Sequence, residues 1–174
     1  MALTDAFIGL GSNLENPVAQ LAGAIAELAA LPDTQLVAQS PFYRSKPVGP
    51  QDQPDFINGC VWLQTSLDPL DLLDQLQAIE QAHGRERLQH WGPRTLDLDM
   101  LLFGDRVIDH PRLQVPHKEL PNRDFVLRPL LDLEPQLTLP DGRRLTELLV
   151  QCPDNQLQRL EPAPNPGPPP VQDQ

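Results

Sequence analysis

Hydrophobic positions along the chain follow two spacings, one typical of strands and the other of helices. Short runs rich in apolar and β-branched residues predict strands over residues 6–10, 35–43, 56–65 and 95–103. Between them, apolar side chains recur at helical spacing over 17–31 and 69–84, which predicts two amphipathic helices. Asn16-Pro17 and Asp68-Pro69 supply a capping residue and a first-turn proline at the two helix starts.

This order of elements favours an α+β fold. The β-α-β-β-α-β order over the first 103 residues predicts a ferredoxin-like sandwich, and C-terminal additions follow it. Apolar spacing indicates a third helix over 122–133, with Pro129 near its start or at a kink, and a short amphipathic run ends at Leu149. This topology hosts many functions, so by itself it identifies none.

Composition indicates one domain followed by a proline-rich tail. The chain has 174 residues, 40% of them hydrophobic, which is enough for one sizeable core. Residues 161–174 contain six of the 21 prolines and a single strongly apolar side chain, Val171. This segment cannot bury enough surface to offset its ordering entropy. We therefore expect a domain over residues 1–160 and a disordered tail over 161–174.

The chain is strongly acidic, but its charge is unevenly distributed. There are 24 acidic and 13 basic side chains, a net charge of −11, which disfavours binding to nucleic acid or to an anionic membrane. Eight of the 13 cations lie within residues 85–128, so a pocket built from that segment can still hold a polyanion. No apolar run approaches the roughly 20 residues that cross a bilayer. Cys60 and Cys152 show no metal-ligand spacing, so we expect a cytoplasmic protein with two reduced thiols.

Two acidic residues on the last predicted strand are the first candidates for chemistry. Because side chains alternate along a strand, Asp97 and Asp99 point to one side while the apolar residues around them face the core. Two carboxylates about 7 Å apart repel each other by roughly 2 kcal/mol at an effective dielectric of about 20. A partly enclosed pair therefore favours a bound cation, and Mg²⁺ commonly takes one or two carboxylates plus substrate phosphates. The alternative is a solvent-facing strand that carries two acids.

Cationic side chains flank this acidic pair in the sequence. They precede it at Arg85, Arg87 and Arg94 and follow it at Arg112, His117, Lys118, Arg123 and Arg128. Guanidinium groups and a metal can share the charge of a phosphate chain, so the segment predicts a phosphate site. The alternative for each cation is a solvated surface position. The Gly9-Leu10-Gly11 motif lacks the third glycine of a dinucleotide-binding loop, and the chain has no GxxxxGK[ST] loop.

Several short motifs occur in an order that resembles one enzyme family. They are Gly9-Leu10-Gly11-Ser12-Asn13, the stretch from Phe42-Tyr43-Arg44 to Gly49-Pro50, Asp55-Phe56-Ile57-Asn58, Trp91-Gly92-Pro93-Arg94-Thr95-Leu96-Asp97-Leu98-Asp99 and Val115-Pro116-His117. Over about residues 3–150, the chain resembles the 6-hydroxymethyl-7,8-dihydropterin pyrophosphokinases of folate biosynthesis. The resemblance implies pyrophosphoryl transfer from ATP to the hydroxymethyl group of the pterin, with release of AMP.

The resemblance also implies roles for individual residues. Asp97 and Asp99 match the pair that holds two Mg²⁺ ions across the triphosphate, and Arg85 and Arg94 match catalytic cations. The residues implied to contact ATP are Gln77, Glu80, Arg87, Trp91, Arg94, Arg112, His117 and Arg123. Those implied to contact the pterin are Ser45, Val48, Phe56, Asn58 and Phe125. Trp91 is implied to lie on a loop that closes over the bound substrates.

Two other functions remain open at the level of the sequence. A ferredoxin-like binding module could sense nucleotides through the same cationic segment, and it would bind ATP without turnover. A pterin aldolase would need neither ATP nor a metal pair, so Asp97 and Asp99 argue against it. Phe56 and Phe125 could also be plain core residues. For a pyrophosphokinase we expect a monomer whose partners are the pterin and ATP, without nucleic acid or membrane.

Overall fold

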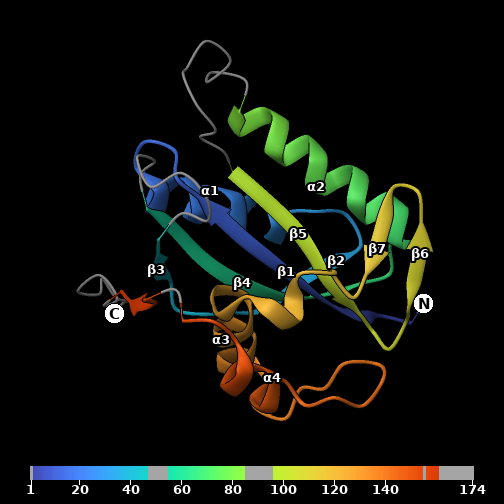
Figure 1. Cartoon of the computed structure of the whole chain (residues 1–174). Helices are drawn as coiled ribbons and strands as arrows, with labels where there is room; N and C mark the ends of the chain where they lie inside the picture. Colours follow the sequence, from blue (N-terminus) through green and yellow to red (C-terminus); the bar gives the residue numbers. More distant parts are fainter. Residues whose placement is uncertain (1, 47–54, 85–95, 155, 161–174) are drawn as a thin grey trace, which may run out of the picture.

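The computed structural model shows a mixed α/β fold built on an antiparallel sheet, and it describes residues 2–46, 55–84, 96–154 and 156–160 (Figure 1). In chain order the elements are β1 (Thr4–Ser12), α1 (Pro17–Ala29), β2 (Thr34–Gln39), β3 (Tyr43–Ser45), β4 (Phe56–Thr65), α2 (Pro69–Gly84), β5 (Leu96–Phe103), β6 (Ile108–His110), β7 (Leu113–Val115), the 3-10 helix η2 (Leu120–Asn122), α3 (Asp124–Leu133), α4 (Leu145–Gln151) and β8 (Gln158–Arg159). The predicted tail at 161–174 lies outside the described residues.

The register of the central strands places distant parts of the sequence side by side. The sheet has the order β5-β1-β4-β3-β8, and β2 pairs with β4 beside this path. β1 runs antiparallel to both of its neighbours, so Gly11 on β1 lies between Asn58 on β4 and Asp97 on β5. Strands are spaced by about 4.8 Å, which puts the backbones of Asn58 and Asp97 about 10 Å apart. The short strands β6 and β7 form a separate hairpin.

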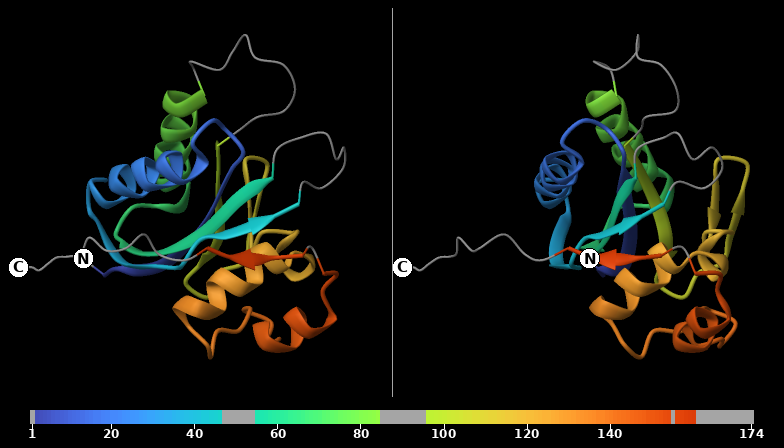
Figure 2. Two further views of the ribbon diagram at one scale, coloured as in Figure 1. Left: turned by 90° about the vertical axis from the view of Figure 1, so that its left-hand side faces the viewer. Right: turned by 60° about the vertical axis from the view of Figure 1, so that its left-hand side comes forward.

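Helices cover both faces of the sheet (Figures 1 and 2). On one face, α1 and α2 bury a helical stripe against the sheet through Leu21, Leu28, Leu72 and Leu76, all 0% exposed. On the other face, α3 and α4 pack against a second buried cluster. Burial of these apolar side chains on two faces is the main favourable contribution to folding. No helix among the described residues is both long enough and apolar enough to cross a membrane.

Most predicted helices and strands are confirmed, but one predicted strand is divided into two separate strands. The strand predicted over 35–43 is split into β2 and β3. The break falls at Ser40-Pro41: the Ser40 hydroxyl accepts the Cys60 N–H at 2.9 Å, and proline has no N–H to continue the pairing with β4. The order before β5 is therefore β-α-β-β-β-α.

Two helix starts also differ from the prediction. Asn16 precedes α1 in the left-handed conformation (φ 56°) and makes no side-chain capping bond, although Pro17 occupies the first turn as predicted. The third helix begins at Asp124 instead of residue 122, because Leu120–Asn122 form a 3-10 turn. Pro129 lies inside that helix, and the run ending near Leu149 is α4. Both cysteines are free thiols, as predicted, and burial raises the pKa of the Cys60 thiol.

Tyr43 links the C-terminal layer to the sheet. It is the single tyrosine of the chain and is 5% exposed on β3. Its hydroxyl donates a hydrogen bond to Asp132 on α3. Burial raises the pKa of Tyr43 to about 12, with further contributions from the hydrogen bond and charge of Asp132. The ionised phenol is thus disfavoured in the folded chain.

A spectrophotometric titration should show this shift directly, because tyrosinate absorbance reports on Tyr43 alone. We expect a midpoint near pH 12 for the folded chain and near pH 10 in denaturant. Because the pKa of Tyr43 is higher in the folded than in the unfolded chain, the protonated phenol contributes to the free energy of unfolding. This contribution is complete below about pH 10 and is lost as the pH rises through about 12. Asp132→Asn removes a charge that opposes ionisation and should lower the folded midpoint. A midpoint unchanged by that substitution would refute the role assigned to Asp132.

Candidate functional site

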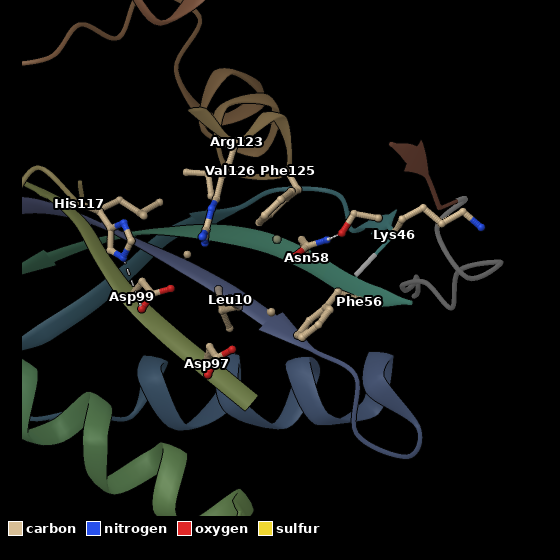
Figure 3. Close-up of a pocket in the computed structure, with 15 residues that line it drawn as sticks. Leu10, Lys46, Phe56, Asn58, Asp97, Asp99, His117, Arg123, Phe125 and Val126 are labelled. Carbon is tan, nitrogen blue, oxygen red and sulfur yellow. Dashed lines mark hydrogen bonds and ion pairs between the residues drawn. The ribbon is translucent and has the colours of Figure 1, made fainter. Parts of the chain in front are cut away.

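A cavity opens on the face of the sheet that carries α3 (Figure 3). Its floor includes Gly9 and Gly11 of β1, which share this face because side chains alternate along the strand. Neither glycine has a side chain to fill the space between β4 and β5. The other lining residues are Leu10, Ser45, Lys46, Phe56, Asn58, Gly59, Asp97, Asp99, Leu101, His117, Arg123, Phe125 and Val126. The cavity thus joins residues from four strands, the loop after β7 and the start of α3.

The two predicted carboxylates lie at one end of this cavity. The alternation predicted for β5 is confirmed, since the side chains of Leu96, Leu98 and Met100 are buried on the opposite face. The Asp99 side chain is 48% exposed, and its Oδ1 lies 3.9 Å from Nε2 of His117. Partial burial raises the pKa of Asp99, while the electrostatic influence of His117 and Arg123 opposes that rise. A bound cation would likewise favour the ionised form.

The donor set fits a magnesium ion. Asp97 and Asp99 both line the cavity and offer hard carboxylate oxygens. Within the described residues, no group of three or more His, Cys, Asp and Glu side chains is placed to hold a metal. A cation at this pair would therefore complete its coordination with water or ligand oxygens. Mg²⁺ is commonly bound in this way, through one or two carboxylates and substrate phosphates.

His117 and Arg123 bring positive or proton-donating groups to the same end. The backbone N–H of His117 donates to the backbone carbonyl of Leu101 at 3.1 Å, which holds the loop after β7 against β5. Nδ1 of His117 accepts the Glu119 N–H at 3.2 Å, so the ring proton of the neutral form is on Nε2, facing Asp99. The Arg123 guanidinium lies 5.6 Å from the ring centre of Phe125 and near Glu119. Both side chains can donate to an anionic ligand beside the carboxylates.

Aromatic and amide groups form the other end of the cavity. Figure 3 shows the rings of Phe56 and Phe125 on either side of Asn58. Both rings are half-buried and line the cavity, so they are not plain core residues. Asn58 is 4% exposed and donates from Nδ2 to Oγ of Ser45 at 2.8 Å. Flat faces around an amide suit a planar heterocycle with polar edges.

A second group of predicted residues lies beside β5, on the side of α2. Nη2 of Arg112 donates to Oδ1 of Asp74 at 2.6 Å and to Oε1 of Gln77 at 3.1 Å. Oε2 of Glu80 accepts the Leu98 N–H at 2.7 Å, between the two aspartates. Burial raises the pKa of Glu80; the Leu98 hydrogen bond opposes this, and the aspartate charges add to it. Gln77, Glu80 and Arg112 are thus near the acidic strand but do not line the cavity.

Other candidates fall outside this arrangement. Lys118 lines a separate cavity beyond His117, and Arg128 contributes to the electrostatic surroundings of Tyr43. Five predicted residues lie outside the described residues: Val48, Arg85, Arg87, Trp91 and Arg94. The predicted closing loop lies outside them too.

Sequence reasoning missed part of the cavity. The floor glycines Gly9 and Gly11 are not among the predicted site residues. The other lining residues that were not predicted are Leu10, Lys46, Gly59, Leu101 and Val126. The signal for the glycines was present: Gly9 and Gly11 are two residues apart on a predicted strand, which places both on one face. No such pattern marks the other lining residues as members of the cavity, because their placement depends on tertiary packing.

Comparisons with known proteins agree with this geometry. The family model described as 7,8-dihydro-6-hydroxymethylpterin-pyrophosphokinase (HPPK) matches residues 7–135. The chain is 56% identical over 154 residues to the 2-amino-4-hydroxy-6-hydroxymethyldihydropteridine pyrophosphokinase of Pseudomonas aeruginosa, covering 88% of this chain and 95% of that protein. It is 49% identical over 157 residues to the protein of the same name from Haemophilus influenzae, covering 90% and 98%.

The solved structures add a likeness of fold. A crystal structure of HPPK-DHPS in complex with substrates matches with a TM-score of 0.69 at 13% identity, over 87% of this chain and 43% of that chain. HPPK-DHPS from Plasmodium falciparum, the A437G form with STZ-DHP, matches with a TM-score of 0.68, over 86% and 45%. The chain thus spans less than half of these larger chains and shares the fold of one part of each.

Proposed function

The chain belongs to the 7,8-dihydro-6-hydroxymethylpterin-pyrophosphokinase family, and from this membership we propose how its residues hold the two substrates. It transfers a pyrophosphoryl group to 6-hydroxymethyl-7,8-dihydropterin in folate biosynthesis, with ATP as the donor that a kinase of this family implies. One observation supports the residue assignment above all: a single cavity has a carboxylate pair at one end and a slot for a flat ring at the other.

The pterin binds at the aromatic end of the cavity. Its ring lies between Phe56 and Phe125, and the Asn58 amide forms hydrogen bonds with a polar edge of the ring. Ser45 and Val48 are the other residues proposed to contact the pterin. The register of Gly11 between Asn58 and Asp97 supports this arrangement. A ring held at Asn58 can extend its hydroxymethyl group along the glycine floor toward the carboxylates.

The triphosphate binds at the acidic end. Asp97 and Asp99 would hold two Mg²⁺ ions, which when bound would neutralise phosphate charge and orient the attacking oxygen. His117 and Arg123 would donate to phosphate oxygens. The contact of Arg123 with Phe125 supports a cation at the boundary between the two proposed substrate sites. The other residues proposed to contact ATP are Gln77, Glu80, Arg87, Trp91, Arg94 and Arg112, and Arg85 and Arg94 are the further catalytic cations proposed.

The reaction is a displacement at the β-phosphorus of ATP. A bond forms between the hydroxymethyl oxygen and this phosphorus, and the bond to the oxygen that bridges the α- and β-phosphates breaks. AMP leaves, and the hydroxyl proton passes to solvent. The chain's contribution is to align the attacking hydroxymethyl oxygen with the leaving bridging oxygen and to exclude competing water.

Several broader features belong to the same proposal. The strand order β5-β1-β4-β2, with α1 and α2 on one face, supports the ferredoxin-like description. The net charge of −11 supports a protein that binds neither nucleic acid nor membrane. We further propose that the chain acts as a monomer in the cytoplasm. The names of its relatives favour this enzyme over the pterin aldolase and the non-catalytic binding module.

The reaction products test the proposed function. Incubation with Mg-ATP and 6-hydroxymethyl-7,8-dihydropterin should give AMP and the pterin diphosphate, and EDTA should stop the reaction. Formation of ADP in place of AMP would indicate transfer of a single phosphoryl group. ATP binding without turnover would support the binding module. Either result would overturn the proposal.

Deletion of residues 161–174 should change neither the melting temperature nor the transfer rate. The reason is compositional, since this segment has almost no apolar surface with which to pack on a domain at 1–160. Differential scanning calorimetry and the AMP assay on the full and shortened chains would measure both effects. A melting temperature lowered by the deletion would show that the segment docks on the domain.

A further inference from the structure

A second cavity lies beyond His117, and the proposed function makes no use of it. It is lined by the segment that leads from β7 to η2, by the turn that precedes α4 and by Val107 just before β6. Its volume is about 250 Å³, below the roughly 300–1,000 Å³ of pockets for drug-sized ligands, so it suits a single ring or a short chain. His117 lines both cavities and thus forms part of the wall between them.

Most of the wall of this second cavity is apolar. Its apolar lining residues are Val107, Pro116, Pro121, Leu139 and Pro140. Proline has no backbone N–H, so the three prolines offer a ligand apolar surface and no backbone donor. The side chain of Val107 is 72% exposed beside them. A ligand with an apolar body would remove this surface from water, which favours binding.

The turn before α4 holds Arg143 in a defined place. The Leu139 N–H donates to the Arg143 carbonyl at 2.9 Å, and Gly142 allows the turn by adopting the left-handed region at φ 93°. The Asp141 carboxylate accepts the backbone N–H of Arg143 at 3.0 Å and its Nε–H at 2.9 Å. Within the described residues the Nη groups of Arg143 make no hydrogen bond, so they can donate to a ligand.

Lys118 brings a second cation to the same cavity. The sequence places it in the cationic segment, but its side chain lines this cavity and not the one that holds Asp97 and Asp99. Among the residues that the structure describes, Lys118 forms no ion pair. The hydrogen bonds from Arg143 hold the pKa of Asp141 below its usual range, so this carboxylate is ionised and offsets one of the two cations. With His117 neutral, the lining keeps one net positive charge, which matches a monoanion.

We propose that this second cavity binds a small organic monocarboxylate, an inference that goes beyond the proposed function. The carboxylate lies between Lys118 and Arg143, and the apolar body of the ligand lies against the prolines and Val107. A planar carboxylate matches the paired N–H donors of a guanidinium group. An inorganic anion would satisfy the cations but leave the apolar wall in water. A neutral ring would cover the wall but leave the cations without a partner.

Benzoate is a probe that tests both halves of this site. It should bind the full chain with a Kd of about 1 mM, as expected for a ligand of this size. Benzamide keeps the shape without the charge, and inorganic phosphate keeps a negative charge without the apolar body. Each should bind at least about tenfold more weakly than benzoate. Benzamide or phosphate binding as tightly as benzoate would overturn the proposal.

An NMR titration without Mg²⁺, ATP or pterin shows which cavity the probe enters. Benzoate should shift the backbone amide signals of Leu139, Gly142 and Arg143 to saturation. The amide signals of Asn58 and Gly59, which line the first cavity, should not move. Shifts confined to Asn58 and Gly59, or shifts that never saturate, would overturn the proposal.

Three variants test the assignment of the cations. Lys118→Ala and Arg143→Ala should each raise the Kd of benzoate by about fivefold or more. Arg144→Ala is the matched control, because Arg144 is the next arginine of the same segment, is exposed and does not line the cavity. It should leave the Kd unchanged. Amide spectra of the unliganded variants would confirm that each is folded. A Kd of Lys118→Ala equal to that of Arg144→Ala would overturn the proposal, and since no measurement requires turnover, failure of the proposed function would appear only in the AMP assay.

Discussion

Replacing Asp97 or Asp99 with alanine should abolish pyrophosphoryl transfer and leave the fold intact. Each substitution removes half of a two-carboxylate donor set, and no third ligand from the described residues can replace it. Metal stabilisation of a reacting phosphate is worth several kcal/mol, so we expect a rate loss of about 1,000-fold or more. Both side chains lie in the cavity instead of the core. Relief of their repulsion, roughly 2 kcal/mol at an effective dielectric of about 20, should keep or raise the free energy of unfolding.

The AMP assay at ordinary Mg²⁺ and thermal unfolding would measure the two effects. Asp109→Ala is the matched control, because Asp109 is an exposed aspartate on the β6–β7 hairpin that does not line the cavity. EDTA treatment of the parent chain should reproduce the loss seen in the variants. Turnover close to that of the parent in either variant would remove Asp97 and Asp99 from the proposed metal site.

The acidic end of the cavity could be predicted because its geometry is local. Alternation on one strand is enough to put Asp97 and Asp99 on the same side and Leu98 in the core. The strand over Phe56–Thr65 and the helix over Pro69–Gly84 were predicted at their observed bounds for a related reason. Their apolar spacing is regular, and turn-forming residues bound them.

The rest depends on pairings between distant segments. The break at Ser40 follows from its hydrogen bonds with Cys60 on β4. The residues of β2 alone do not indicate this partner, because it lies 20 positions further along the chain. The charge distribution predicts a cationic segment, but it does not distinguish the positions of the individual arginines. Arg112 turns toward Asp74, whereas Arg123 enters the cavity. The relation of Gly11 to Asn58 is likewise a matter of strand register. Such contacts between residues far apart in sequence decide which side chains share a site.

Asn58→Ala should weaken binding of the pterin far more than binding of ATP. Truncation removes the acceptor Oδ1 and leaves Ser45 and the Tyr43 carbonyl without their amide partner. An unpaired buried polar group costs roughly 1–3 kcal/mol, which corresponds to a Kd raised by about 5- to 150-fold. ATP should be spared because the carboxylates proposed to anchor it lie two strands away, across β1. Calorimetric titration of each ligand separately would measure the difference.

Two further variants determine whether the lost affinity comes from the amide chemistry. Asn58→Asp keeps the shape but replaces the two N–H donors with an oxygen that faces the Tyr43 carbonyl, so it should weaken the pterin at least as much as alanine. Gln64→Ala is the control, because Gln64 is an amide on the same strand whose Nε2 donates to Asp5 at 3.0 Å, away from the cavity. It should change neither Kd. Equal losses of pterin and ATP in Asn58→Ala would instead assign Asn58 a structural role in joining β3 to β4.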